Sequence, residues 1–87
     1  MSNSPESSNE ILFFTRPGCH LCDDAWPWVN DLAQRYHLKV KKVYIQEDQE
    51  LTSKYGERIP VLEYGGIEIG WGRLDPKTVE RKLKGNL

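Results

Sequence analysis

The feature that most constrains the fold is a short apolar segment followed at once by a long helical pattern. Residues 11–15 are all apolar, aromatic or β-branched, and Arg16-Pro17-Gly18 ends the run. This composition is typical of a strand that is buried on both faces. Between residues 22 and 37, apolar residues recur with the helical period. The expected core-facing residues of this helix are Ala25, Val29, Leu32 and Tyr36. We therefore expect a buried strand that leads into an amphipathic helix, with Trp26 at the rim of the core or against a partner.

The middle of the chain predicts a strand, a short helix and a hairpin. Residues 38–45 have the composition of a strand, and residues 49–55 can form a short helix that Gly56 ends. Two further strands, at residues 61–64 and 67–71, flank a Gly-Gly pair. Such a pair suits the positive φ angles of a type I′ turn, so these strands should be antiparallel.

The last helix has a well-marked start. Asp75 can cap it, Pro76 suits its first position, and Leu74 can pack against Val79 as the helix runs toward Leu83. The resulting order is strand, helix, strand, short helix, strand, strand, helix. We expect an α/β fold in which helices flank a mixed four-stranded sheet and a right-handed crossover joins the first two strands.

Length and composition favour one small domain. The chain has 87 residues, of which 38% are hydrophobic. This is enough for one hydrophobic core and too little for a second domain. Residues 1–9 are rich in Ser and Asn, which predicts a flexible N-terminal tail before a domain at residues 10–87.

Charge and hydropathy argue against several classes of partner. The formal net charge is −1, from 12 basic and 13 acidic residues that are interspersed. Such a chain has no broad field that would attract nucleic acid or an anionic membrane. No apolar run approaches the ~20 residues of a membrane span, and residues 1–10 lack the pattern of a signal peptide. We expect a cytoplasmic monomer that binds neither nucleic acid nor membranes.

The two cysteines, Cys19 and Cys22, suggest thiol–disulfide exchange. They are too few for a secreted disulfide scaffold, and a bridge over so short a loop would contribute only about 2 kcal/mol of stability. Exchange needs a thiolate that attacks a disulfide and a second thiol that resolves the mixed disulfide. Cys19 precedes the helix, whose free N–H groups favour a thiolate, so we expect it to be the exposed nucleophile. Cys22, in the first turn, should be the partly covered resolving thiol.

A Cys-x-x-Cys pair is also compatible with other functions. A zinc site needs four ligands, and the chain offers Cys19, Cys22, His20 and His37, but His37 should lie some turns away along the helix. One chain cannot readily close such a site, so we assign no metal ligand. A metal ion or Fe–S cluster shared at an interface stays open as an alternative. So does a redox-inactive binding module whose cysteines are idle.

Two segments resemble a known family. Residues 13–22, Phe-Phe-Thr-Arg-Pro-Gly-Cys-His-Leu-Cys, and residues 58–62, Arg-Ile-Pro-Val-Leu, are similar to those of glutaredoxin-like proteins of the thioredoxin superfamily. The resemblance covers nearly all of residues 10–87, and Pro27 matches the proline that kinks the active-site helix of thioredoxins. It implies a thioredoxin-like, glutaredoxin-type fold, a cis Ile59–Pro60 bond near the dithiol, and thiol–disulfide oxidoreductase activity.

The resemblance also implies a substrate site. Arg16 stands where glutaredoxins often carry a Lys near a glutathione carboxylate, and Asp75 at the last helix would receive the γ-glutamyl end. Trp71 stands where small residues would let glutathione approach the backbone, so it either fills that space or stacks on a ligand. The expected substrate-binding residues are Arg16, His20, Leu21, Ile59, Pro60, Trp71 and Asp75.

The sequence departs from the family pattern in two places. Cys19-His20-Leu21-Cys22 is neither the Cys-Pro-Tyr-Cys of glutaredoxins nor the Cys-Gly-Pro-Cys of thioredoxins, and residues 70–75 lack the compact Gly-Gly-x-Asp segment. We therefore expect no tightly bound cofactor, with glutathione as a weakly bound co-substrate. The expected partners are disulfide-containing proteins or glutathione, and a thioredoxin-type reductase is the other candidate electron donor.

Overall fold

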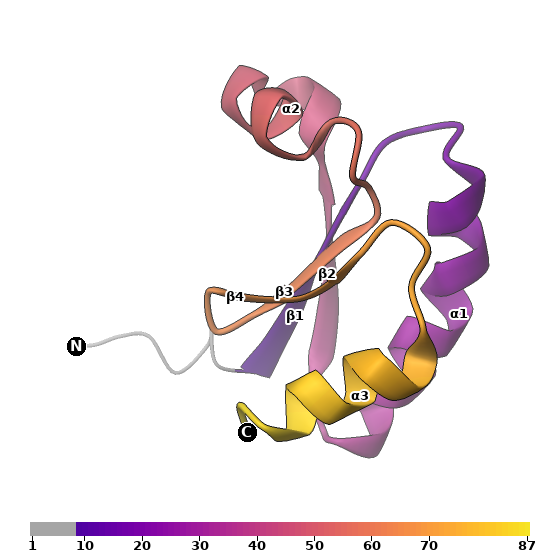
Figure 1. Ribbon diagram of the computed structural model, residues 1–87, viewed down its shortest axis with the longest axis vertical. Helices are drawn as coiled ribbons and strands as arrows, with labels where there is room; N and C mark the ends of the chain where they lie inside the picture. The colour runs from indigo at the N-terminus through magenta and orange to yellow at the C-terminus, as the bar shows by residue number, and fades with distance from the viewer. Residues whose placement is uncertain (1–8) are drawn as a thin grey trace.

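The computed structural model describes residues 9–87, so the predicted tail at residues 1–9 lies almost wholly outside the described residues. The described part contains a four-stranded sheet with the strand order β2-β1-β3-β4 and helices packed around it (Figure 1). In chain order the elements are β1 (Glu10–Thr15), α1 (His20–Arg35), β2 (Lys39–Tyr44), the 3-10 turn η2 (Ile45–Glu47), α2 (Gln49–Tyr55), β3 (Val61–Tyr64), β4 (Ile67–Trp71) and α3 (Pro76–Lys84). This order confirms the predicted sequence of strands and helices. No helix within residues 9–87 has the length and apolar character needed to cross a membrane.

Strand β1 lies inside the sheet. It pairs in parallel with β2, to which α1 connects it, and antiparallel with β3, which pairs antiparallel with β4. Ile11, Phe13, Phe14 and Thr15 are all buried. The uninterrupted apolar run of this segment is therefore explained by neighbours on both edges and both faces of β1.

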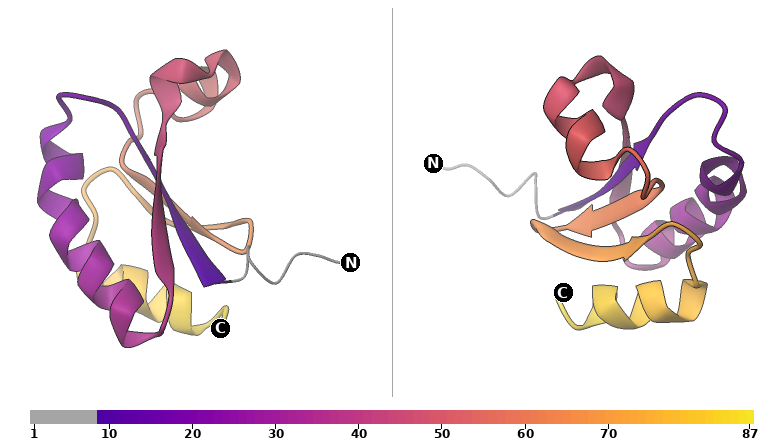
Figure 2. Two further views of the ribbon diagram at one scale, coloured as in Figure 1. Left: turned by 180° about the vertical axis from the view of Figure 1, so that it is seen from behind. Right: turned by 45° about the horizontal axis from the view of Figure 1, so that its top comes forward.

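Helices α1 and α3 pack on the same face of the sheet (Figure 2). Phe13 is paired with Leu62, and Leu62 with Gly70, and directly paired residues share a face. The Trp26 ring of α1 meets Phe13 edge-on at 5.1 Å between centroids, while Gly70 lies against Val79 of α3. Trp26 thus occupies the half-buried rim position that was one of its two expected places.

The short helix α2 covers part of the opposite face. Phe14 points away from α1, and the centroid of its ring lies 4.5 Å from that of the Tyr55 ring. Tyr55 is the last residue of α2. Asp48 caps the start of α2 by accepting hydrogen bonds from the backbone N–H groups of Glu50 and Leu51. As a result, α2 lies at the end of the sheet where β1 and β2 finish, which is also where α1 begins (Figure 1).

The core stripe of α1 is shorter than predicted. Ala25, Val29 and Leu32 are buried as expected, but the helix ends at Arg35 and Tyr36 is only half-buried at its C-cap. Tyr36 instead donates a hydrogen bond of 2.6 Å from its hydroxyl to Glu80 of α3. Its phenol group lies at the edge of the core because that group needs a polar partner.

The hairpin and the last helix form as expected. The turn between β3 and β4 has φ of 60° at Gly65 and 82° at Gly66, which only residues tolerant of positive φ adopt easily. Asp75 caps α3 by accepting a hydrogen bond from the Thr78 N–H, and Pro76 is the first residue of the helix. These contacts define the start of α3.

Candidate active site

The loop after β1 delivers Cys19 to the start of α1. Gly18, with φ of 80°, lets the chain turn sharply before the helix. Cys19 is the N-cap residue, and its Sγ accepts a hydrogen bond of 3.2 Å from the backbone N–H of Cys22. The sulfur therefore takes the place of the oxygen that usually caps a helix, and the helix N-terminus favours negative charge on it.

The two cysteines are joined as a disulfide across the first turn of α1. Their Cα atoms are 5.2 Å apart, which lies within the usual range for such a bridge. Cys22 is only 3% exposed, whereas Cys19 is half-buried. The sulfur of Cys19 is therefore the more accessible one, and the structure represents the oxidised form of the pair.

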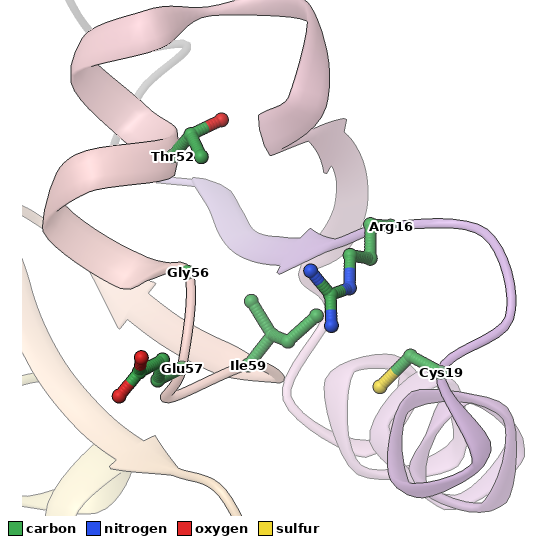
Figure 3. Close-up of a pocket in the computed structure, with 6 residues that line it drawn as sticks. All are labelled: Arg16, Cys19, Thr52, Gly56, Glu57 and Ile59. Carbon is green, nitrogen blue, oxygen red and sulfur yellow. The ribbon is translucent and has the colours of Figure 1, made fainter.

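A pocket of about 550 Å³ opens beside Cys19. Its lining comes from the loop after β1, from α2 and from the loop before β3. Figure 3 shows the Cys19 sulfur facing the space in which the Arg16 guanidinium and the Ile59 side chain meet. The lining residues are Arg16, Cys19, Thr52, Gly56, Glu57 and Ile59.

Ile59 belongs to a segment that is held firmly in place. The Ile59–Pro60 peptide bond is cis, as the resemblance implies. The backbone N–H of Gly72 donates hydrogen bonds of 2.8 Å to the carbonyl oxygens of both Arg58 and Pro60, on either side of Ile59. The loop after β4 thus supports the segment that forms one wall of the pocket.

The expected substrate-binding residues do not all meet in this pocket. Arg16 and Ile59 line it together with Cys19. Pro60 is buried beside Ile59, while His20 and Leu21 lie exposed on the first turn of α1 outside the lining. Trp71 and Asp75 line a separate, smaller hollow between β4 and α3, of about 190 Å³.

Trp71 and Asp75, the two expected substrate-binding residues in the second hollow, already contact other residues of the protein. The Asp75 carboxylate accepts hydrogen bonds from the hydroxyl and the backbone N–H of Thr78, and these bonds lower the pKa of Asp75 from its ordinary value. Trp71 is 55% exposed, and the Arg58 guanidinium lies over its ring at 4.9 Å from the centroid. Arg58 also forms an ion pair with Glu68. Trp71 is therefore part of a stack on the sheet rather than a wall of the dithiol pocket.

The sequence interpretation missed three lining residues, Thr52, Gly56 and Glu57. Thr52 and Gly56 reach the pocket only because α2 packs beside the dithiol, which no local pattern indicates. Glu57 stands two residues before Ile59, so its place near the expected cis-proline segment was the available signal. Within residues 9–87, no group of three or more His, Cys, Asp or Glu side chains is arranged to hold a metal ion.

Comparisons with known proteins place the chain in a family. The model of the family described as "Glutaredoxin-like domain (DUF836)" matches residues 10–84. No curated protein sequence matches the chain.

Solved structures with the same fold support this match. The X. campestris protein XcR50 is 32% identical, with 86% of this chain and 96% of that chain covered and a TM-score of 0.71. Protein Ne2328 from Nitrosomonas europaea is 24% identical over 94% of this chain and 98% of that chain, with a TM-score of 0.73. A mutant thioredoxin from Halobacterium salinarum is 28% identical over 91% and 76% of the two chains, with a TM-score of 0.66. The predicted thioredoxin-like fold is confirmed.

Proposed function

This chain belongs to the glutaredoxin-like domain family of the thioredoxin superfamily, and from this premise we propose that it is an oxidoreductase that reduces disulfides of proteins or small molecules. One observation carries the proposal. The Cys19 sulfur caps α1, accepts a backbone hydrogen bond and faces a pocket, with Cys22 buried one helical turn away. An accessible thiol at a helix N-terminus, next to a covered one, is the arrangement that stepwise exchange requires.

The reaction moves two electrons from the dithiol to the substrate. The Cys19 thiolate attacks one sulfur of a substrate disulfide, a bond forms between the two sulfurs, and the other substrate sulfur leaves as a thiolate that takes up a proton. The Cys22 thiol then loses its proton and attacks the Cys19 sulfur. The second substrate thiol is released, and the Cys19–Cys22 disulfide seen in the structure is the product.

We assign substrate contacts to the wall opposite Cys19 and to the surface around it. An extended substrate would lie along the Ile59–Pro60 segment as an added strand, with its reactive sulfur at Cys19. Arg16 would meet an anionic group of that substrate. His20 and Leu21, exposed beside the dithiol, would contact the surface of a protein substrate.

The oxidised pair must be reduced again before another turnover. Two molecules of glutathione, with one thiol each, or one dithiol of a thioredoxin-type reductase would supply the two electrons by the reverse exchange. Neither donor needs a cofactor bound to this chain. Glutathione is the weaker candidate because Arg16 and Asp75 line different hollows.

The test is the reduction of insulin with dithiothreitol as the terminal reductant. The wild-type protein should accelerate precipitation of the insulin B chain well above the rate with dithiothreitol alone, and Cys19→Ser should return the rate to that background. A wild-type rate equal to the background would overturn the proposal and favour a binding module with idle cysteines.

A further inference from the structure

The pocket beside Cys19 carries opposite charges at its two ends. Figure 3 shows the Arg16 guanidinium on the Cys19 side of Ile59, while the Glu57 carboxylate lies beyond Ile59 and points away from Cys19. Both charged residues line the same pocket, and both are exposed. A substrate that lies along Ile59 with its reactive sulfur at Cys19 therefore meets the Arg16 cation close to Cys19 and the Glu57 anion farther from it.

Neither charge is neutralised by a partner within residues 9–87. The ion pairs in this part of the chain join Arg35 to Glu80 and Arg58 to Glu68. Arg58 directly follows Glu57, but Glu68 and the Trp71 ring hold its guanidinium. Glu57 is thus left to interact with whatever enters the pocket.

The other nearby cation is engaged as well. Lys54, on α2, places its ammonium group 5.0 Å from the centroid of the Tyr55 ring. Tyr55 in turn donates its hydroxyl to Glu63 on the sheet. The two basic residues that are closest to Glu57 along the chain are therefore directed to the sheet face under α2 and not to the pocket.

We propose that Glu57 determines substrate specificity by selecting a peptide or protein disulfide that carries a Lys or Arg on one side of its reactive cysteine. The proposal rests on the function proposed above and names its substrate class. A cationic side chain beyond Ile59 meets the Glu57 carboxylate, whereas a carboxylate at that place is repelled. The pocket thereby disfavours small disulfides that present only anionic groups there.

The expected size of the preference follows from the exposure of the charge pair that Glu57 would form with the Lys or Arg of the substrate. Charge pairs at a protein surface change a binding equilibrium by about two- to five-fold, and 1 M salt shortens the screening length to about 3 Å. We expect a preference of this size at low ionic strength, with most of it lost in high salt. An apolar contact would not weaken in this way.

The experiment measures the first exchange step on matched peptides. Each of four peptides carries one cysteine, which is linked to thionitrobenzoate through a disulfide. The peptides differ only in one residue, which is Lys or Glu and stands either before or after the cysteine. Cys19 of the reduced Cys22→Ser protein attacks the peptide sulfur, because thionitrobenzoate is the better leaving group, and the released colour gives the rate. For one of the two placements, the Lys peptide should react about two- to five-fold faster than the Glu peptide.

Variants at Glu57 and Glu50 identify the carboxylate responsible. Glu57→Gln should bring the ratio of rates close to one, and Glu57→Lys should invert it. Glu50→Gln removes an equal charge from α2 outside the pocket and should keep the ratio. Equal rates for all peptides, or a ratio that persists in Glu57→Gln, would overturn the role of Glu57 while the oxidoreductase function stands. If no peptide reacts faster than with Cys19→Ser, the proposed function itself fails, and this proposal fails with it.

Discussion

At the scale of single residues, the two sulfurs differ in what surrounds them. Cys22 is packed into the core at 3% exposure, and Cys19 occupies the N-cap, where its side chain faces the pocket. A covered thiol is slow to meet a bulky reagent, while a capping thiol is both accessible and electrostatically favoured as a thiolate. The same chemical group therefore has two different reactivities three residues apart.

This difference predicts opposite phenotypes for the two serine variants. Cys19→Ser should abolish exchange, whereas Cys22→Ser should accumulate a mixed disulfide through Cys19, because the resolving attack is missing. Mass spectrometry of each variant after incubation with a peptide disulfide measures the adduct. Faster alkylation of Cys22 than of Cys19 in the reduced wild-type protein would contradict the assignment.

A second residue-scale prediction concerns alkaline pH. Burial raises the pKa of Tyr55 above its ordinary value of 10.0, and so does the hydrogen bond to Glu63. The folded protein therefore holds this proton more tightly than the unfolded chain does. Its contribution to stability is complete below pH about 10 and is lost as the pH rises through the folded-state pKa.

Urea unfolding at several pH values measures this effect. Tyr55→Phe should lower stability near neutral pH by about 1 kcal/mol, because the hydrogen bond is lost, and should lose less additional stability above pH 10 than the wild type. Tyr36→Phe is the matched control. The Tyr36 hydroxyl also donates to a carboxylate, that of Glu80, and this hydrogen bond raises the pKa of Tyr36. Tyr36 is only half-buried, however, whereas Tyr55 is buried. Parallel pH curves for wild type and Tyr55→Phe would contradict the prediction.

At the scale of elements, local patterns predicted where strands and helices lie but not how β4 is shaped. Strict alternation places Ile67, Ile69 and Trp71 on one face. In the structure the register of β3 and β4 shifts between Leu62 and Glu63, so that Ile69 is buried and Trp71 is exposed. Such a bulge depends on the pairing of two strands and leaves little trace in either one alone.

The bulge brings Gly70 close to α3, and this predicts a sensitive position. A methyl group on Gly70 would lie 2.9 Å from side-chain carbon atoms of both Leu74 and Val79, so Gly70→Ala must shift these side chains or displace β4 or α3. Overpacking of this kind lowers the free energy of unfolding by about 1–3 kcal/mol. Chemical denaturation of the purified variant measures the change.

Gly85→Ala is the matched control for Gly70→Ala. Gly85 follows α3 with φ of −67°, and a methyl group there would meet its nearest neighbours, the carbonyl oxygens of Arg81 and Lys82, at an ordinary 3.6 Å. We expect this variant to be neutral or more stable by up to about 1 kcal/mol, because alanine restricts the unfolded chain. Equal effects of the two substitutions would show that steric contact at Gly70 is not the cause.

At the scale of the whole molecule, local sequence patterns predicted the architecture, whereas the make-up of the site depends on how distant elements pack together. The crossover through α1 and the Gly65-Gly66 hairpin leave few ways to order the strands, so the fold followed from the sequence. The dithiol and the Ile59–Pro60 segment were found because each is a local pattern. The lining by α2 and the separation of Asp75 from Arg16 depend on how distant elements pack, and no spacing in the sequence encodes that.

That separation predicts poor use of glutathione. A tripeptide that is held at both ends needs its anchors in one groove, but Arg16 lines the dithiol pocket while Asp75 lines a second hollow and already accepts hydrogen bonds from Thr78. Loss of one charge-assisted anchor lowers affinity by about one to two orders of magnitude relative to an ordinary glutaredoxin. Titration of the Cys22→Ser protein with glutathione disulfide measures the affinity directly.

Turnover with the two candidate reductants completes the comparison. If one end of glutathione is left unheld, a thioredoxin-type reductase should support faster steady-state reduction than glutathione at matched reducing capacity. Rapid, saturable turnover with glutathione that disappears in Arg16→Ala would reverse this conclusion. Arg16 alone would then suffice as the ionic anchor for glutathione, without Asp75 in the second hollow.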